Sequence, residues 1–134
     1  MYNKIVRVKP VKINSKELAS QLAKAQLTPY WKVSPNGSSL IRTCEFPNFE
    51  TTWGFLTQVS MRAHLWGHHP SIATTYNRVS LELTTHDLRD DSSEITSSGT
   101  STMGGISDID IKLAKKIEEY IHIYSSEEKN SGTT

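Results

Sequence analysis

The chain has 134 residues, a single cysteine and no long hydrophobic run. One thiol cannot form a disulfide within the chain, so we expect a reducing compartment. No apolar stretch approaches the ~18 residues that a membrane helix requires, so we expect no membrane span. Lys and Arg number 15 against 14 Asp and Glu, a balance that predicts no general attraction to nucleic acid or to an anionic membrane. Cys44 lies in a strand-like stretch, which favours a small buried hydrophobe over a nucleophile.

The first ten residues are basic but lack the apolar core of a signal peptide. They are also poor in the serines and arginines of a transit peptide. We therefore expect a cytoplasmic protein, leave a nuclear location open, and favour mitochondrial import less. The length, with 36% hydrophobic and 22% charged residues, predicts one domain over 1–134 with its core at about 14–124.

The first half of the chain predicts a helix followed by a hairpin. Asn14 can cap a helix and Glu17 can reach back to it, and Thr28-Pro29 ends the pattern. A strand over 30–33, a turn over 34–38 and a returning strand over 40–46 follow.

A longer helix is expected between Asn48, a suitable N-cap, and Gly67, which enters the left-handed conformation cheaply. Pro70 favours an extended backbone at the preceding residue, so His68 and His69 should point to different sides. Residues at steps of three and four predict the buried face of this helix: Phe49, Trp53, Leu56, Ser60 and Ala63.

After a short connector, residues 76–86 have the alternation of a half-buried strand, with Val79, Leu81 and Leu83 on one face and His86 at the far end. A mobile insertion loop is expected over 87–104, because its Ser/Thr-rich run has almost nothing to bury.

Ser107 can cap a final helix, with Asp110 at the capping-box position, and the polar tail over 125–134 should fray. The expected order is helix, hairpin, helix, strand, helix. It predicts an α+β fold, an antiparallel sheet with helices on one face. The apolar stripe of the final helix consists of Ile109, Leu113, Ile117, Ile121 and Tyr124.

The candidate chemistry lies in His68, His69 and His86. They have no HxxxH or HxH spacing among themselves, and adjacent histidines on an extended chain diverge, so we expect no metal site. General acid–base catalysis suits imidazole, which exchanges protons near neutral pH. From the residues alone, purely structural or surface roles are an equal alternative.

Several ordered motifs together resemble the pterin-4a-carbinolamine dehydratases, over a stretch from Trp31 to about Ile121. They are Phe46-Pro47-Asn48-Phe49, His68-His69-Pro70, Tyr76-Asn77-Arg78-Val79, Thr85-His86 and Gly105-Ile106-Ser107-Asp108-Ile109-Asp110.

The resemblance implies an antiparallel sheet of about four strands and a homodimer or homotetramer. It implies dehydration of 4a-hydroxytetrahydropterins to the quinonoid dihydropterin, in pterin cofactor recycling, with neither metal nor cofactor. A different class stays open: a non-catalytic dimerisation module that binds a transcription factor.

The same resemblance assigns roles to individual residues. It places catalysis at His68, His69, His86 and Asp110, with His68 and His86 as acid and base in either order and His69 holding the substrate. Asp110 either orients a histidine or only closes the Ser107 capping box. The residues implied in pterin binding are His68, His69, Pro70, Thr85, His86 and Trp31.

Three departures from the family pattern stand out. His64 replaces a glutamate that many relatives place before the histidine pair, and Ile72 replaces a tryptophan. The link between His86 and Asp110 is longer than in compact relatives, which leaves the placement of Asp110 to be tested.

Overall fold

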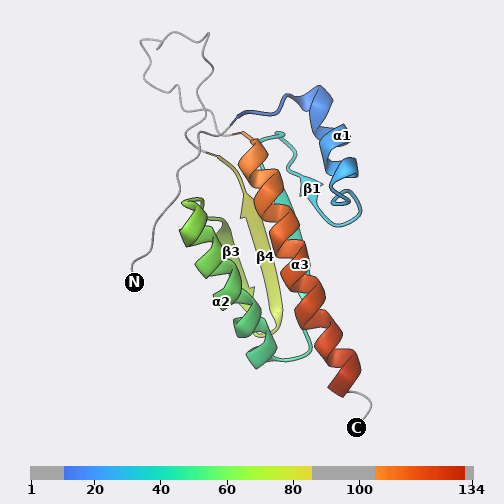
Figure 1. Cartoon of the computed structure of the whole chain (residues 1–134), viewed down its shortest axis with the longest axis vertical. Helices are drawn as coiled ribbons and strands as arrows, with labels where there is room; N and C mark the ends of the chain where they lie inside the picture. Colours follow the sequence, from blue (N-terminus) through green and yellow to red (C-terminus); the bar gives the residue numbers. More distant parts are fainter. Residues whose placement is uncertain (1–10, 86–104, 132–134) are drawn as a thin grey trace.

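The computed structural model describes residues 11–85 and 105–131, and only the backbone of residues 126–131. Across these ranges the helices are α1 (Ser15–Lys24), α2 (Phe49–Trp66) and α3 (Asp108–Ser131). The strands are β1 (Lys32–Val33), β2 (Leu40–Glu45), β3 (Ser71–Thr75) and β4 (Arg78–Leu83). They form one sheet in the order β1-β2-β4-β3, and every neighbouring pair is antiparallel (Figure 1).

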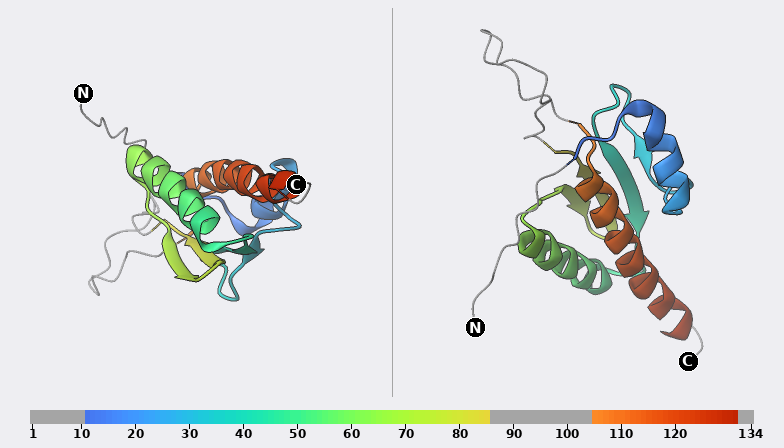
Figure 2. Two further views of the ribbon diagram at one scale, coloured as in Figure 1. Left: turned by 90° about the horizontal axis from the view of Figure 1, so that it is seen from below. Right: turned by 45° about the horizontal axis from the view of Figure 1, so that its top comes forward.

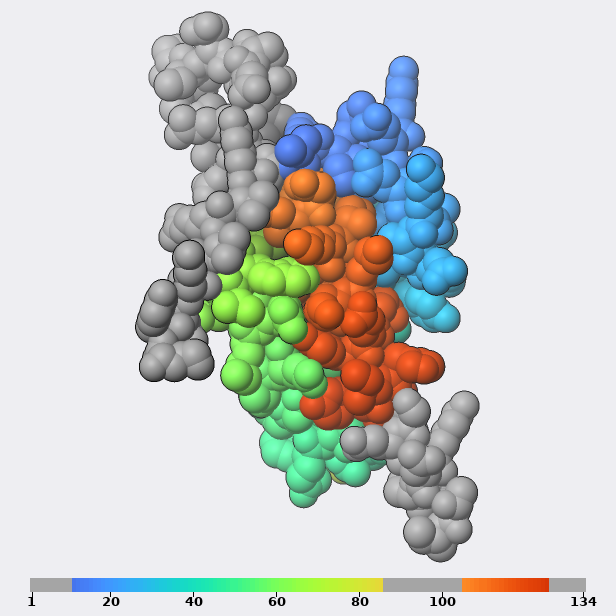
Figure 3. Space-filling model, viewed as in Figure 1, coloured from blue at the N-terminus to red at the C-terminus, as the bar shows by residue number. Residues whose placement is uncertain are grey.

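Helices α2 and α3 lie side by side in a layer above strands β3 and β4 (Figure 2). The space-filling view shows their side chains meeting along much of one face of the molecule (Figure 3). Beneath them Val79, Leu81 and Leu83 of β4 are buried, while the residues between them are not. This alternation confirms the α+β fold predicted from the sequence, with helices on one face of an antiparallel sheet.

Both ends of α2 have the predicted caps. The Asn48 side chain accepts a hydrogen bond from the Thr51 backbone N–H at 2.7 Å. Gly67 ends the helix at φ 68° and ψ 29°, and the His68 N–H bonds back to the Ala63 carbonyl at 3.0 Å. This Schellman-type ending fixes the direction in which the chain leaves the helix.

The predicted buried face of α2 is partly wrong. Phe49 and Trp53 are 48% and 46% exposed, and Ser60 is exposed as well. Leu56 and Ala63 satisfy both this stripe and the observed one, and the large aromatic side chains favoured the wrong choice between them. The residues that α2 does bury are Thr52, Phe55, Leu56, Val59 and Ala63.

The connector predicted before residue 76 is instead strand β3, which pairs with β4 across the two-residue turn Tyr76-Asn77. Apart from Ile72, its residues Ser71 to Thr75 are small or polar and lack a clear alternation, so the pattern did not reveal an edge strand. Tyr76 adopts φ 52°, and the Asn77 amide donates to the Phe46 carbonyl at 2.8 Å. The turn is therefore tied to the segment that begins α2.

Cys44 lies on β2, partly buried, and burial raises the pKa of its thiol to about 11. The thiol is protonated at neutral pH, in agreement with the expectation that it is not a nucleophile. The predicted loop over 87–104 lies outside the described residues.

Helix α1 ends with Gln26 in the left-handed conformation, at φ 61°. We expect Gln26→Gly to stabilise the fold by about 0.5–1 kcal/mol, because glycine adopts this conformation without a steric cost. The matched change Gln21→Gly, inside the same helix, should destabilise it by about 1 kcal/mol. Urea unfolding of the two variants measures both values, and equal signs would contradict this account of the helix end.

Candidate active site

The centre of the site is a contact between His68, just after α2, and Asp110, in the first turn of α3. The His68 Nε2 atom lies 2.5 Å from the Asp110 Oδ1 atom. The Asp110 side chain has no exposed surface, and that of His68 is 13% exposed. A buried carboxylate requires partners for both oxygens, and the imidazole supplies one of them.

The second carboxylate oxygen of Asp110 is held by two neighbours. Oδ2 accepts hydrogen bonds from the Ser107 backbone N–H at 2.9 Å and from the Thr85 hydroxyl at 2.8 Å. The Ser107 hydroxyl lies 2.7 Å from the Thr85 hydroxyl, to which it can donate. Asp110 therefore caps its own helix and also binds a histidine, so the two roles left open by the sequence are combined in one side chain.

The backbone brings these groups together despite the long link. Thr85 and Gly105 exchange two backbone hydrogen bonds, of 2.8 and 3.1 Å. The Ile13 N–H also bonds to the Ile106 carbonyl at 2.9 Å. These bridges fix the start of α3 beside the end of β4, so Asp110 keeps its place at the site.

The hydrogen bonds define which nitrogen of His68 is available. With Asp110 as a carboxylate that accepts hydrogen bonds at both oxygens, the hydrogen of this contact is assigned to His68 Nε2. Nδ1 is then the nitrogen of the neutral ring that can accept a proton. Among the described residues, none is hydrogen-bonded to Nδ1.

His69 points elsewhere, as the sequence predicted. Its side chain is exposed, and its ring centroid lies 5.8 Å from that of His64. Pro70, which follows it, is half-buried at the start of β3. The two adjacent histidines thus lie in different environments: His68 is part of the buried network, and His69 is at the surface.

Trp31 directly precedes β1 and contacts α3 further along that helix, away from Asp110. It is 2% exposed, and its Nε1–H donates to the Glu118 carboxylate at 2.9 Å. Glu118 lies on α3, eight residues after Asp110. Its carboxylate also pairs with Arg42, whose Nε lies 2.5 Å from Glu118 Oε1. The structure therefore joins His68, Thr85 and Asp110 directly, whereas the Trp31 indole N–H is used two helical turns away. His86 lies outside the described residues.

Sequence reasoning missed the part that Ser107 takes in this network. It identified Ser107 only as a helix cap, yet its hydroxyl meets Thr85 and its N–H meets Asp110. The three-residue spacing of Ser107 and Asp110 was the available signal. In a capping box the acidic side chain accepts from the N–H of the cap residue, so an aspartate that also contacts a histidine links that histidine to Ser107.

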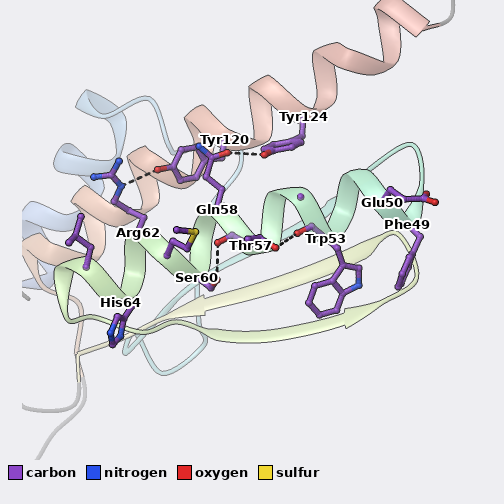
Figure 4. Close-up of a pocket in the computed structure, with 13 residues that line it drawn as sticks. Phe49, Glu50, Trp53, Thr57, Gln58, Ser60, Arg62, His64, Tyr120 and Tyr124 are labelled. Carbon is purple, nitrogen blue, oxygen red and sulfur yellow. Dashed lines mark hydrogen bonds between the residues drawn. The ribbon is translucent and has the colours of Figure 1, made fainter. Parts of the chain in front are cut away.

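In the ranges 11–85 and 105–131 no three or more His, Cys, Asp or Glu side chains gather in a way that could hold a metal ion. Nor does any helix there have the length and apolarity to cross a membrane. A shallow groove of about 1160 Å³ runs along α2 toward α3, and neither His68 nor Asp110 lines it (Figure 4). The groove and the buried network are separate features.

Comparison with known proteins adds the family. The family model of pterin 4 alpha carbinolamine dehydratase matches residues 11–120, which include every described member of the network. The chain belongs to the pterin-4a-carbinolamine dehydratase family.

Two relatives named for this family align with the chain over most of their own length. A Saccharomyces cerevisiae protein, named provisionally as a pterin-4-alpha-carbinolamine dehydratase, is 43% identical over 126 residues, 90% of this chain and 96% of that protein. A Chloroflexus aurantiacus protein with the same provisional name is 35% identical over 81% of this chain and 95% of its own. A crystal structure from Brucella melitensis, described as a transcriptional coactivator/pterin dehydratase, superposes with a TM-score of 0.63 at 26% identity. That match covers 81% of this chain and 97% of the other.

We expect Thr85→Val to destabilise this dehydratase-family fold by about 1–3 kcal/mol, because it deprives buried Asp110 of a donor while keeping the side-chain shape. Thr43→Val is the matched control, since Thr43 is exposed on β2, and it should change the free energy of unfolding by less than about 0.5 kcal/mol. Urea unfolding decides between them. Equal stabilities for the two variants would show that the Thr85 hydroxyl does not support the carboxylate.

Proposed function

We propose that this protein dehydrates 4a-hydroxytetrahydropterins to the quinonoid dihydropterin by general acid–base catalysis, within pterin cofactor recycling in the cytoplasm. Family membership supports the substrate class. The observation that carries the mechanism is the contact between His68 Nε2 and the buried Asp110 carboxylate. It fixes an imidazole in one tautomer beside a counter-charge, an arrangement that proton-transfer enzymes use repeatedly.

The reaction requires two proton transfers. The C4a–O bond breaks as the leaving hydroxyl takes up a proton and departs as water, and the ring nitrogen N5 loses its proton. His68 suits the second transfer, because Nδ1 can accept the N5 proton while Asp110 stabilises the imidazolium that forms. A protonated acid must then serve the leaving hydroxyl, and we assign that role to His86.

The other residues have supporting roles in this proposal. His69, exposed beside the pair, contacts the substrate, and Pro70 shapes the chain at that point. Thr85 and Trp31 act through neighbours, since the Thr85 hydroxyl holds Asp110 and the Trp31 N–H holds Glu118. Asp110 is likewise a positioning residue.

The decisive experiment is a dehydration assay with freshly generated 4a-hydroxytetrahydropterin, corrected for the uncatalysed rate. His68→Ala should lower kcat by about 10²–10⁴, the usual contribution of one general acid or base. Asp110→Asn should lower kcat with little change in KM, because this residue positions His68 without touching substrate. Thermal melts confirm that each variant is folded.

His122→Ala is the matched control. His122 lies on α3 about 18 Å along the helix axis from Asp110, at about 1.5 Å per residue. Its substitution should leave kcat unchanged. A folded His68→Ala variant with the rate of the parent protein would remove His68 from the mechanism.

We also propose that the chain works as a homo-oligomer, a dimer or a tetramer. Exposed apolar side chains line one side of α2, with Phe49 and Trp53 at its start and Met61, 68% exposed, nearer its end (Figure 4). Tyr76 of the β3–β4 turn stacks on Phe49 at 6.2 Å between centroids and extends this surface. An apolar surface of this kind is typical of an interface.

Light scattering after size exclusion should give a mass of two or four times the chain mass, for a dimer or a tetramer. Trp53→Glu should lower that mass, because it places a charge in the buried interface. Val11→Glu changes an exposed valine (62%) outside α2 and should leave the mass as it was. A parent protein that is monomeric at every concentration would contradict the proposal.

The same surface favours one alternative function, a module that docks on a transcription factor. The Brucella melitensis structure is described as a transcriptional coactivator/pterin dehydratase. The two functions make different demands on the chain. Docking depends on the α2 side chains and survives His68→Ala, whereas dehydration requires His68.

A further inference from the structure

His64 is one of the family departures that the proposed reaction does not use, and its ring lies near that of His69. The two rings lie 5.8 Å apart between centroids with their planes at 48°. Both side chains are exposed. Figure 4 shows His64 pointing from the end of α2 away from α3, on the side of Ser60.

The helix ending between His64 and His69 brings the two residues near each other. The Gly67 N–H bonds to the His64 carbonyl and the His68 N–H to the Ala63 carbonyl, both at 3.0 Å. These bonds reverse the chain at Gly67 and return His69 toward the last turn of α2. The backbone therefore brings the two residues close together, and their side-chain conformations give the observed distance between the rings.

This spacing suits two imidazoles that share one ion. A Zn–N bond is about 2.0–2.1 Å long, so two rings bound to one ion through one nitrogen each have centroids about 5–6 Å apart. The observed 5.8 Å lies within that range. Imidazole selects zinc, copper and nickel ions and disfavours magnesium and calcium, which prefer oxygen ligands.

We propose that His64 and His69 form a two-histidine site for a divalent transition-metal ion, and that a bound ion blocks access of substrate to His69. Within residues 11–85 and 105–131, no third His, Cys, Asp or Glu side chain joins the pair. The sequence argument against a metal concerned His68, His69 and His86; His64 stands five residues before His69 and forms a different pair. The blocking effect rests on the proposed function, whereas the binding does not.

Isothermal titration of the full-length chain without a histidine tag, with zinc chloride as the probe, tests the binding. The parent protein should take up one ion at this pair. His64→Gln and His69→Gln should each weaken zinc binding by at least about 10-fold to 100-fold. Mutation of a residue that only supports a metal ligand already costs this much, and each of these variants removes a ligand itself. His122→Gln is the matched control and should bind zinc like the parent protein.

Copper provides a second readout, since the electron paramagnetic resonance spectrum of bound Cu²⁺ reports nitrogen ligands. Two nitrogens in the parent protein and one in either variant support the site. No zinc uptake by the parent protein, or unchanged uptake by His64→Gln, would overturn it.

The blocking effect is measured as the dehydration rate with zinc divided by the rate of the same variant without it. The zinc concentration that half-inhibits the parent protein should equal the concentration that half-saturates the site in the titration. His64→Gln should be inhibited only at a correspondingly higher concentration. Binding at the pair without inhibition would overturn the blocking effect alone. Absence of dehydration in metal-free protein would instead count against the proposed function and leave the titration to decide the site.

Discussion

The buried carboxylate of Asp110 is the group on which the rest of the site depends. It joins three parts of the fold: the Ser107 N–H at the start of α3, the Thr85 hydroxyl after β4, and the His68 ring after α2. A buried charge must be satisfied on both oxygens, so the helix start, the strand exit and the imidazole constrain one another. Stability and the proposed proton transfer thus depend on one set of hydrogen bonds, and we expect a change in any partner to alter both.

Much of this arrangement could be predicted from the sequence because its signals are local. The caps at Asn48 and Gly67 and the alternation of Val79, Leu81 and Leu83 each depend on a few neighbouring residues. What failed depends on distant contacts. The predicted and the observed buried faces of α2 share Leu56 and Ala63, and only packing against α3 and the sheet decides between the two faces (Figure 2). Strand β3 is visible only through its pairing with β4. The resemblance indicated only that Asp110 could orient a histidine. That this histidine is His68, 42 residues away in the sequence, is seen only in the structure.

Two surfaces flank the network, and each follows from the way α2 is used. Because α2 buries Phe55 and Val59, its aromatic residues Phe49 and Trp53 are left for another surface. Because Gly67 reverses the chain, His69 returns beside His64. The three proposed activities would therefore lie apart along one helix: association along its length, ion binding at its last turn, and proton transfer just beyond its end.

In the proposed mechanism, Asp110 holds His68 through Nε2 and leaves Nδ1 as the proton acceptor. Nitrogen-15 NMR of histidine-labelled protein, with His68 assigned through its loss in His68→Ala, measures this directly. The account predicts that neutral His68 has a protonated Nε2 and an unprotonated Nδ1 with the far-downfield shift of that state. In Asp110→Ala this preference should weaken. A neutral His68 protonated at Nδ1 in the parent protein would contradict the account.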